Sequence, residues 1–192
     1  AARTRPEDIP LSFAQQRMWF VNQLDTTSAA YNIPIVVTLS GDLDVGALNS
    51  ALTDVVARHE SLRTMFPVRG DWPVQQILPA AGAVPALIPV TVSDEQLRGE
   101  VTRLVSAGFD VTVGLPLRVG LYSLSATEHV LAVVVHHISA DGFSMVPLVR
   151  DVMTAYAPAS RAARPTGAPA GAVRRLRPVA TGVAGSDDDP SR

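Results

Sequence analysis

The stretch from Val130 to Gly142, which reads VLAVVVHHISADG, constrains the fold more than any other part of the chain. It begins with an uninterrupted apolar run rich in β-branched side chains, which is typical of a strand buried on both faces. Two adjacent histidines follow the run. Because successive strand residues point to opposite faces, one of His136 and His137 can pack inside while the other faces an opening. An Asp-Gly pair then turns the chain, and a helix is predicted to follow.

A histidine held at the end of a buried strand is well placed to act as a base in a cleft. A lone histidine in such a place is more often a packed side chain with satisfied nitrogens. Here the pair is followed by Asp141 and Gly142 at a strand-to-helix turn, so that the chain reads HHxxxDG from His136. This pattern resembles the active-site motif of the condensation domains of nonribosomal peptide synthetases, relatives of the chloramphenicol acetyltransferase-like acyltransferases.

Two further segments resemble motifs of the same family. Residues 12–21 read SFAQQRMWFV and resemble SxAQxRLWxL, from which they depart only at Met18 and Val21, both apolar substitutes for leucine. Residues 58–66 read RHESLRTMF and match RHExLRTxF at every fixed position. Alone, these segments would indicate an amphipathic helix on a core and a solvated helix end. Together with HHxxxDG they form a specific set, and the resemblance covers residues 8–156.

Hydrophobic periodicity and capping signals predict the other elements. Ser12 and Ser93 are the expected N-caps of two helices, and Gln96 completes a capping box with Ser93. Pro34 suits the start or the edge of its strand, because proline cannot donate to a ladder. The predicted helices span residues 11–24, 45–59, 93–107 and 143–156, and the predicted strands span residues 31–40, 62–68, 74–78, 117–124 and 129–136.

The composition argues against several classes of function. The 192 residues suffice for one domain with an adequate core, and a net charge of −2 without a basic stretch argues against a nucleic-acid binder. The chain has no cysteine, and its four histidines lack zinc-ligand spacing, so no metal is expected. No segment resembles a signal peptide or reaches the roughly 20 apolar residues that span a bilayer, so a soluble, cytoplasmic protein is expected.

The resemblance implies an α/β fold of the chloramphenicol acetyltransferase-like type. The expected structure is an α/β sandwich half-domain with a mostly antiparallel or mixed sheet and flanking helices. A whole domain of this family has two such halves, so residues 8–156 are expected to be the N-terminal half, with the missing C-terminal half as a partner.

The reaction that the resemblance implies forms an amide between a donor acyl or peptidyl thioester and an acceptor aminoacyl thioester. Both substrates are carried on the phosphopantetheine of peptidyl carrier domains, with an adenylation domain adjoining, and no cofactor is expected to bind the chain directly. His137 is the expected catalytic residue, in contact with the acceptor amine as a base or as a positioning and stabilising group. His136 is expected to pack or to orient the site.

Four more residues are expected to support the site. Asp141 is expected to have a structural role in an ion pair with Arg58 or Arg63, because a carboxylate beside a buried turn needs a charged partner. Gly142 is expected to let the backbone pass close to its neighbours without a Cβ.

Two other functions remain open from the sequence. A stand-alone acyltransferase of the same superfamily, using a CoA or carrier thioester, shares HHxxxDG, although the motifs in residues 12–21 and 58–66 favour the peptide-synthetase branch. A non-catalytic remnant or an interaction half-domain is favoured by the missing half, because the substrate channel of the family runs between two halves.

The character of the chain changes at about Ala157. Residues 157–184 are dominated by alanine, proline, arginine and glycine without an apolar period, so a disordered tail is predicted over residues 157–192. A family motif resembling YxDYAxWQ is missing there. Residues 171–182 can be back-translated into DNA whose reading frame one base later encodes VQYADYALWQR, which contains that motif. A tail translated out of frame is therefore the leading hypothesis for residues 157–184, and a genuine linker is the alternative.

Overall fold

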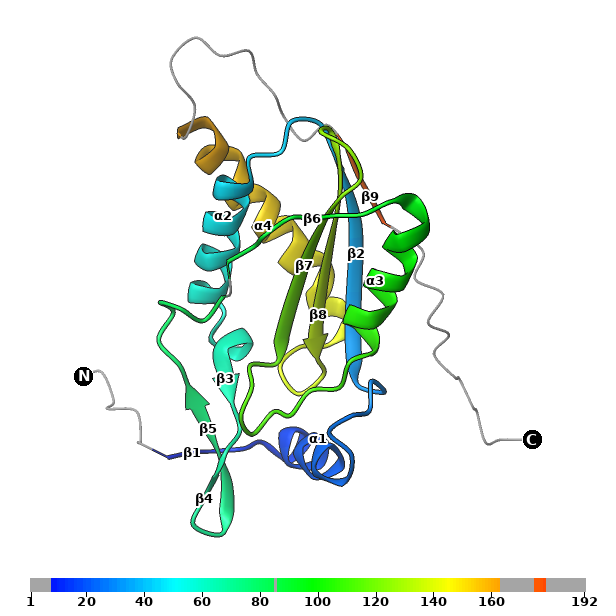
Figure 1. Cartoon of the computed structure of the whole chain (residues 1–192). Helices are drawn as coiled ribbons and strands as arrows, with labels where there is room; N and C mark the ends of the chain where they lie inside the picture. The colour runs from blue at the N-terminus through cyan, green and yellow to red at the C-terminus, as the bar shows by residue number, and fades with distance from the viewer. Residues whose placement is uncertain (1–7, 85, 163–174, 179–192) are drawn as a thin grey trace.

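A five-stranded sheet forms the centre of the molecule, and helices cover both of its faces (Figure 1). The computed structural model describes residues 8–84, 86–162 and 175–178. The elements in chain order are β1 (Ile9–Pro10), α1 (Phe13–Leu24), β2 (Asn32–Ser40), α2 (Val45–Arg58), the 3-10 helix η1 (Glu60–Arg63), β3 (Thr64–Met65), β4 (Val68–Arg69), β5 (Trp72–Ile77), β6 (Val90–Thr91), α3 (Asp94–Ser106), β7 (Leu117–Ser123), β8 (Glu128–His136), α4 (Gly142–Ala162) and β9 (Arg175–Pro178).

Strand β8 lies in the middle of the central sheet, whose order is β6-β7-β8-β2-β9. It pairs antiparallel with β2 along its whole length and with β7 from His129 to Val135. Only the β6–β7 pair is parallel among the described strands, so the sheet is mixed. Residues 129–136 are all buried, as the continuous apolar run predicts. This mixed sheet with flanking helices confirms the predicted α/β sandwich.

The two faces of the central sheet pack against different helices. Leu131, Val133 and Val135 of β8 pack with α2 and α4 in one hydrophobic core. The alternate residues of β8 pack with α3 and the segment after it in a second core. Because side chains alternate along a strand, His136 has the same facing as the second set and points toward the α3 side.

Strand β5 organises a second, smaller sheet, in which it pairs with β1, β3 and β4. The turn between β4 and β5 contains Gly70, whose φ of 61° is a conformation that favours glycine. The predicted strand over residues 62–68 is instead divided between η1, β3 and β4. Pro67 separates β3 from β4 because proline has no N–H to give to a ladder.

The predicted caps and the predicted edge position are present. Ser12 accepts a hydrogen bond from the backbone N–H of Gln15, Ser93 accepts from that of Gln96, and both helices have a complete capping box. On the side of β2 away from β8, β9 pairs only with residues 37–40. Pro34 therefore lies where β2 has no described partner on that side, as expected for a proline in a strand.

Two stretches beyond Tyr156 differ from the predicted disorder. Helix α4 continues to Ala162, and Arg175–Pro178 forms β9 against β2. The prediction of a disordered tail is wrong for these stretches. An unpaired strand edge offers backbone groups for pairing, which accounts for β9, whereas α4 continues through Pro158 in spite of the low helix propensity of proline. The other residues of 157–192, with most of the segment on which the out-of-frame hypothesis rests, lie outside the described residues. No helix in the described part of the chain is long and apolar enough to cross a membrane.

Candidate active site

The two histidines at the carboxyl end of β8 have opposite environments. His136 is the last residue of the strand and only 2% exposed. His137 is exposed and begins a turn, and its backbone N–H donates to the carbonyl of Tyr31 at 2.9 Å. The buried strand thus holds the turn by its backbone while the His137 side chain is open to solvent. This is the division of the pair that side-chain alternation predicts.

The His136 ring is enclosed by aromatic side chains. Phe109 meets it edge to face with ring centroids 5.8 Å apart, and the Tyr31 ring lies at 6.2 Å. The backbone N–H of Ile138 donates to Nδ1 of His136 at 3.2 Å. A nitrogen that accepts a hydrogen bond carries no proton, so a neutral His136 carries its proton on Nε2.

Burial, as the largest cause, and the charges of His137 and Arg118 together lower the pKa of His136 from 6.5 to about 4. Burial disfavours the charged form of an imidazole, which explains the direction of the change. At neutral pH, His136 is therefore an uncharged packing group. Its surroundings suit a side chain that orients the turn, whereas the side chain of His137 is exposed to solvent.

Asp141 does not form the ion pair expected from the sequence. It is exposed, and its carboxylate accepts hydrogen bonds from the backbone N–H of Ser144 at 2.8 Å and from the Ser144 hydroxyl. These bonds lower the pKa of Asp141 below its usual value. Asp141 is therefore the N-cap of α4, which is a local role that an exposed carboxylate fills at a helix start.

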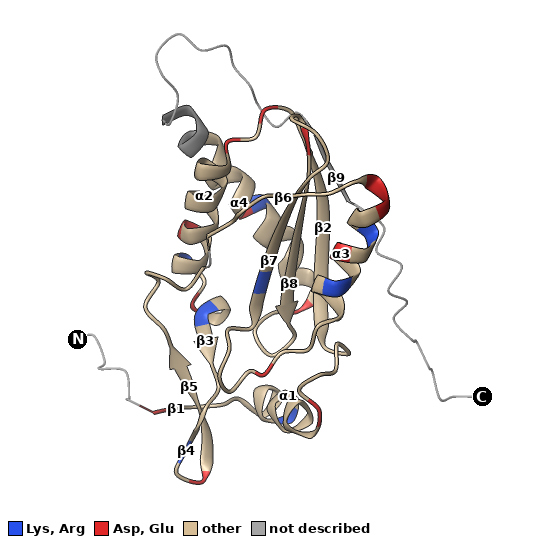
Figure 2. Cartoon of the chain, in the orientation of Figure 1, with Lys and Arg blue, Asp and Glu red and all other residues tan. Residues whose placement is uncertain are grey.

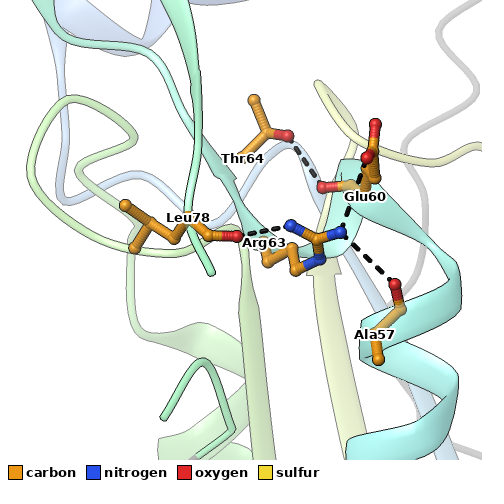
Figure 3. A network of polar contacts seen from close by, with 5 residues as sticks. All are labelled: Ala57, Glu60, Arg63, Thr64 and Leu78. Atoms are coloured by element: carbon orange, nitrogen blue, oxygen red, sulfur yellow. Dashed lines mark hydrogen bonds and ion pairs between the residues drawn. The ribbon is translucent and has the colours of Figure 1, made fainter. Parts of the chain in front are cut away.

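The predicted partners of Asp141 are engaged elsewhere or point to solvent. Arg63 donates to the carbonyl of Leu78, donates to the carbonyl of Ala57 at 3.3 Å, and lies 3.5 Å from a carboxylate oxygen of Glu60 (Figure 3). It therefore ties the end of α2 to the residue after β5. Arg58 is exposed in the last turn of α2, where a cation interacts favourably with the helix dipole.

The expected reason for Gly142 is also wrong. A Cβ built at Gly142 would meet no atom within 4 Å, so close backbone approach does not require this glycine. Close approach is found instead at Gly108, where a Cβ would lie 2.2 Å from the carbonyl oxygen of Thr26. Nothing in the residues that neighbour Gly108 in the sequence indicates that another backbone segment passes beside it.

The structure adds a contact that the sequence did not predict. Nε2 of His59 lies 3.1 Å from a carboxylate oxygen of Asp151, which joins the end of α2 to α4. An open cavity of about 450 Å³ lies near this pair, lined by residues that include His59, Ser139 and Asp141. His59 belongs to the motif in residues 58–66, but no pattern in the sequence marked Asp151. Among the described residues, no cluster of histidine and acidic side chains could hold a metal ion.

Comparisons with known proteins place this geometry in a family. A family model described as the condensation domain matches residues 6–169. The dimodular nonribosomal peptide synthase of Bacillus subtilis (strain 168) is 45% identical over 165 residues, which make up 86% of this chain and 7% of that protein.

Solved structures agree with this match. The X-domain from teicoplanin biosynthesis, in its complex with OxyB, is 40% identical with a TM-score of 0.77, and the match covers 85% of this chain and 35% of that one. The first condensation domain of the CDA synthetase has a TM-score of 0.70 at 24% identity, over 86% of this chain and 44% of that one, which shows the fold. The chain thus spans less than half of these relatives, and it belongs to the condensation-domain family of nonribosomal peptide synthetases.

Proposed function

We propose that this chain is the histidine-bearing half of a domain that condenses two carrier-bound substrates. The observation that carries the proposal is the division of the histidine pair at the end of β8. His136 is buried and neutral, and His137 is exposed on a turn that is fixed by its own backbone. A reactive group held in place in this way loses little freedom when a substrate arrives, and orientation of this kind makes a large contribution to catalysis.

In the proposed reaction, the amine of an acceptor aminoacyl thioester attacks the carbonyl carbon of a donor acyl or peptidyl thioester. A carbon–nitrogen bond forms, the carbon–sulfur bond breaks, and the amine proton finally neutralises the released thiolate. His137 contacts the amine, as the base that removes the proton or as the group that positions the amine and stabilises the developing charge. The phosphopantetheine arms belong to the substrates, so the chain itself supplies no cofactor.

The partners that this proposal requires are two peptidyl carrier domains, an adenylation domain that loads a carrier, and a second half-domain that completes the channel. The need for a second half-domain is supported by coverage, because the chain matches only 35% and 44% of the two solved chains. The synthase from Bacillus subtilis, of which the chain matches 7%, supports a multidomain setting.

The test is reconstitution. The chain is produced together with the C-terminal half of a related condensation domain, and loaded donor and acceptor carriers are added. Mass spectrometry of the acceptor carrier should show the amide product when both halves are present. A correctly folded assembly of the two halves that forms no product would contradict the proposal.

A second function is favoured by one observation. The teicoplanin X-domain, whose solved structure is a complex with OxyB, is 40% identical to this chain, whereas the first condensation domain of the CDA synthetase is 24% identical. A domain of this fold can thus serve as a docking platform for another protein. A chain with this role would fold and bind a partner enzyme while forming no amide in the reconstitution. A stand-alone acyltransferase has no comparable observation in its favour.

A further inference from the structure

Arg118 is the single charged residue of β7, the strand on which Figure 2 shows the colour of a basic residue, and it is partly buried. Its guanidinium donates to the carbonyls of Leu104 at 3.0 Å, Ala107 at 2.7 Å and Gly108 at 2.7 Å. These carbonyls belong to the last turn of α3 and the residues after it, where no helical N–H is left to satisfy them. Arg118 therefore acts as the C-terminal cap of α3.

The same guanidinium lies on an aromatic ring that reaches the histidine pair. The carbon at its centre is 3.7 Å from the centroid of the Phe109 ring, a cation–π arrangement. The backbone that follows this ring is held by Asn22 of α1. Its amide group donates to the carbonyl of Phe109 at 2.7 Å, and its oxygen accepts from the N–H of Val111 at 3.3 Å.

Phe109 in turn packs edge to face on His136, at 5.8 Å and 73°. With Nδ1, His136 accepts the hydrogen bond from the N–H of Ile138 and so fixes the turn that begins at His137. The contacts thus run without interruption from Arg118 through Phe109 and His136 to the backbone that carries the exposed histidine.

We propose that Arg118 is a positioning residue for the histidine pair. By holding the Phe109 ring against His136, it fixes the imidazole that accepts from Ile138 and thereby fixes the direction of His137. The part of this inference that concerns catalysis rests on the proposed function, whereas the part that concerns the His136 ring does not.

The chemistry of the site calls for arginine in particular. A guanidinium is flat and has five N–H donors, so it can donate to three carbonyls with its edge while its face lies on a ring. A lysine at the same position keeps the charge and some donors, but it has no flat face for Phe109. Arg118→Lys therefore separates positioning from mere charge, and Arg118→Met removes both.

The first experiment follows the histidine rings of the 192-residue chain by nitrogen-15 NMR as the pH is lowered. The charged or titratable groups that act on His136 are His137 in the same turn and Arg118 on β7, and the Tyr31 ring faces it from the lead-in to β2. In the unmodified chain, His136 should keep its proton on Nε2 and titrate near a pH of about 4.

Arg118→Met should raise the titration midpoint of His136 above about 4, because a nearby positive charge is removed, and should introduce the tautomer with the proton on Nδ1. Arg118→Lys should also introduce this tautomer, with a smaller rise in the midpoint. Arg98→Met, at an exposed position of α3, is the matched control and should change neither. If Arg118→Met does not fold, the same NMR titration of the Arg118→Lys chain tests the proposal. A folded Arg118→Lys chain whose His136 keeps its tautomer and midpoint would overturn the proposal.

The second experiment uses the reconstituted domain. Arg118→Lys should lower kcat by roughly tenfold while leaving KM for the loaded carriers within about twofold, because orientation and not binding is lost. If the Arg118→Lys domain has the same kcat as the Arg98→Met control, the proposal that Arg118 positions His137 for catalysis is overturned. If the unmodified domain forms no amide, the proposed function fails, and the NMR experiment still decides whether Arg118 positions His136.

Discussion

At the scale of single residues, two neighbouring imidazoles differ in their exposure to solvent. His137 is exposed on the turn, whereas His136 is enclosed by Phe109 and Tyr31. In the reconstituted domain, His137→Ala should lower the condensation rate by about a hundredfold or more, as is usual for loss of a general acid–base group. His136→Gln should lower it far less at equal folding. Rates of amide formation compare the two variants, and far-UV circular dichroism checks that both are folded. Equal, small losses of rate in both variants would remove His137 from its proposed role.

The low pKa of His136 links stability to pH. Its pKa in the folded chain is about 4, below the 6.5 of an unperturbed histidine, so the unfolded chain binds a proton first as the pH falls. The contribution of this residue to stability is therefore complete above pH 6.5 and is lost progressively as the pH falls toward 4. The loss amounts to about 3 kcal/mol at most. Urea unfolding at pH 7 and pH 4.5 measures it, and a His136→Gln chain that loses the same free energy over this interval would contradict the assignment.

Asp141 has a local role that predicts a small effect. Asn is as good an N-cap as Asp, so Asp141→Asn should leave the Tm of the chain within about 1 °C. Asp141→Ala removes the acceptor for the Ser144 N–H and should lower the Tm by roughly 2 to 4 °C. Differential scanning calorimetry of the two variants distinguishes this cap from the buried ion pair that the sequence predicted. A large decrease in the Tm of Asp141→Asn would favour the buried ion pair.

The residues that the sequence identified correctly are those whose signal is local. The HHxxxDG motif located the end of β8, and two serine caps located helix starts, because each depends on residues close together in the chain. The sequence did not reveal the partners of Asp141 or the stacking of Arg118 on Phe109. Such contacts depend on which side chains and carbonyls the fold brings together, and Asn22 reaches Phe109 across an interval of 87 residues.

At the scale of elements, the close approach of the α3–β7 connection to the α1–β2 connection depends on one missing side chain. A Cβ at Gly108 would lie 2.2 Å from the carbonyl oxygen of Thr26 and 2.6 Å from the Cα of Thr27, and backbone atoms cannot move away cheaply. Gly108→Ala should therefore destabilise the chain by about 1 to 3 kcal/mol.

Gly99 offers a matched control within α3. A Cβ there would meet nothing within 4 Å, so Gly99→Ala should stabilise the helix by roughly 0.5 to 1 kcal/mol. The urea midpoints of the two variants should thus move in opposite directions. A Gly108→Ala chain as stable as the unmodified chain would show that the two connections are not packed together as described.

At the scale of the whole molecule, the 192-residue chain tested alone should not catalyse condensation. In the proposed function the opposite wall of the channel comes from a second half, and without it the thioester arms are not held in attack geometry. Orientation can be worth roughly 7 to 11 kcal/mol of barrier. The exposed Phe143 and Val146 at the start of α4, 92% and 75% exposed, are candidates for contact with that second half. Amide formation by the chain alone at the rate of the reconstituted domain would show that one half is sufficient.

The central position of β8 has a consequence for hydrogen exchange. The strand is hydrogen-bonded to β2 on one side and to β7 on the other, and its side chains belong to both cores. Its amide hydrogens cannot meet solvent through fraying of an edge, so they should exchange only when the whole unit opens. The strand backbone that leads to His137 is thus as persistent as the fold itself.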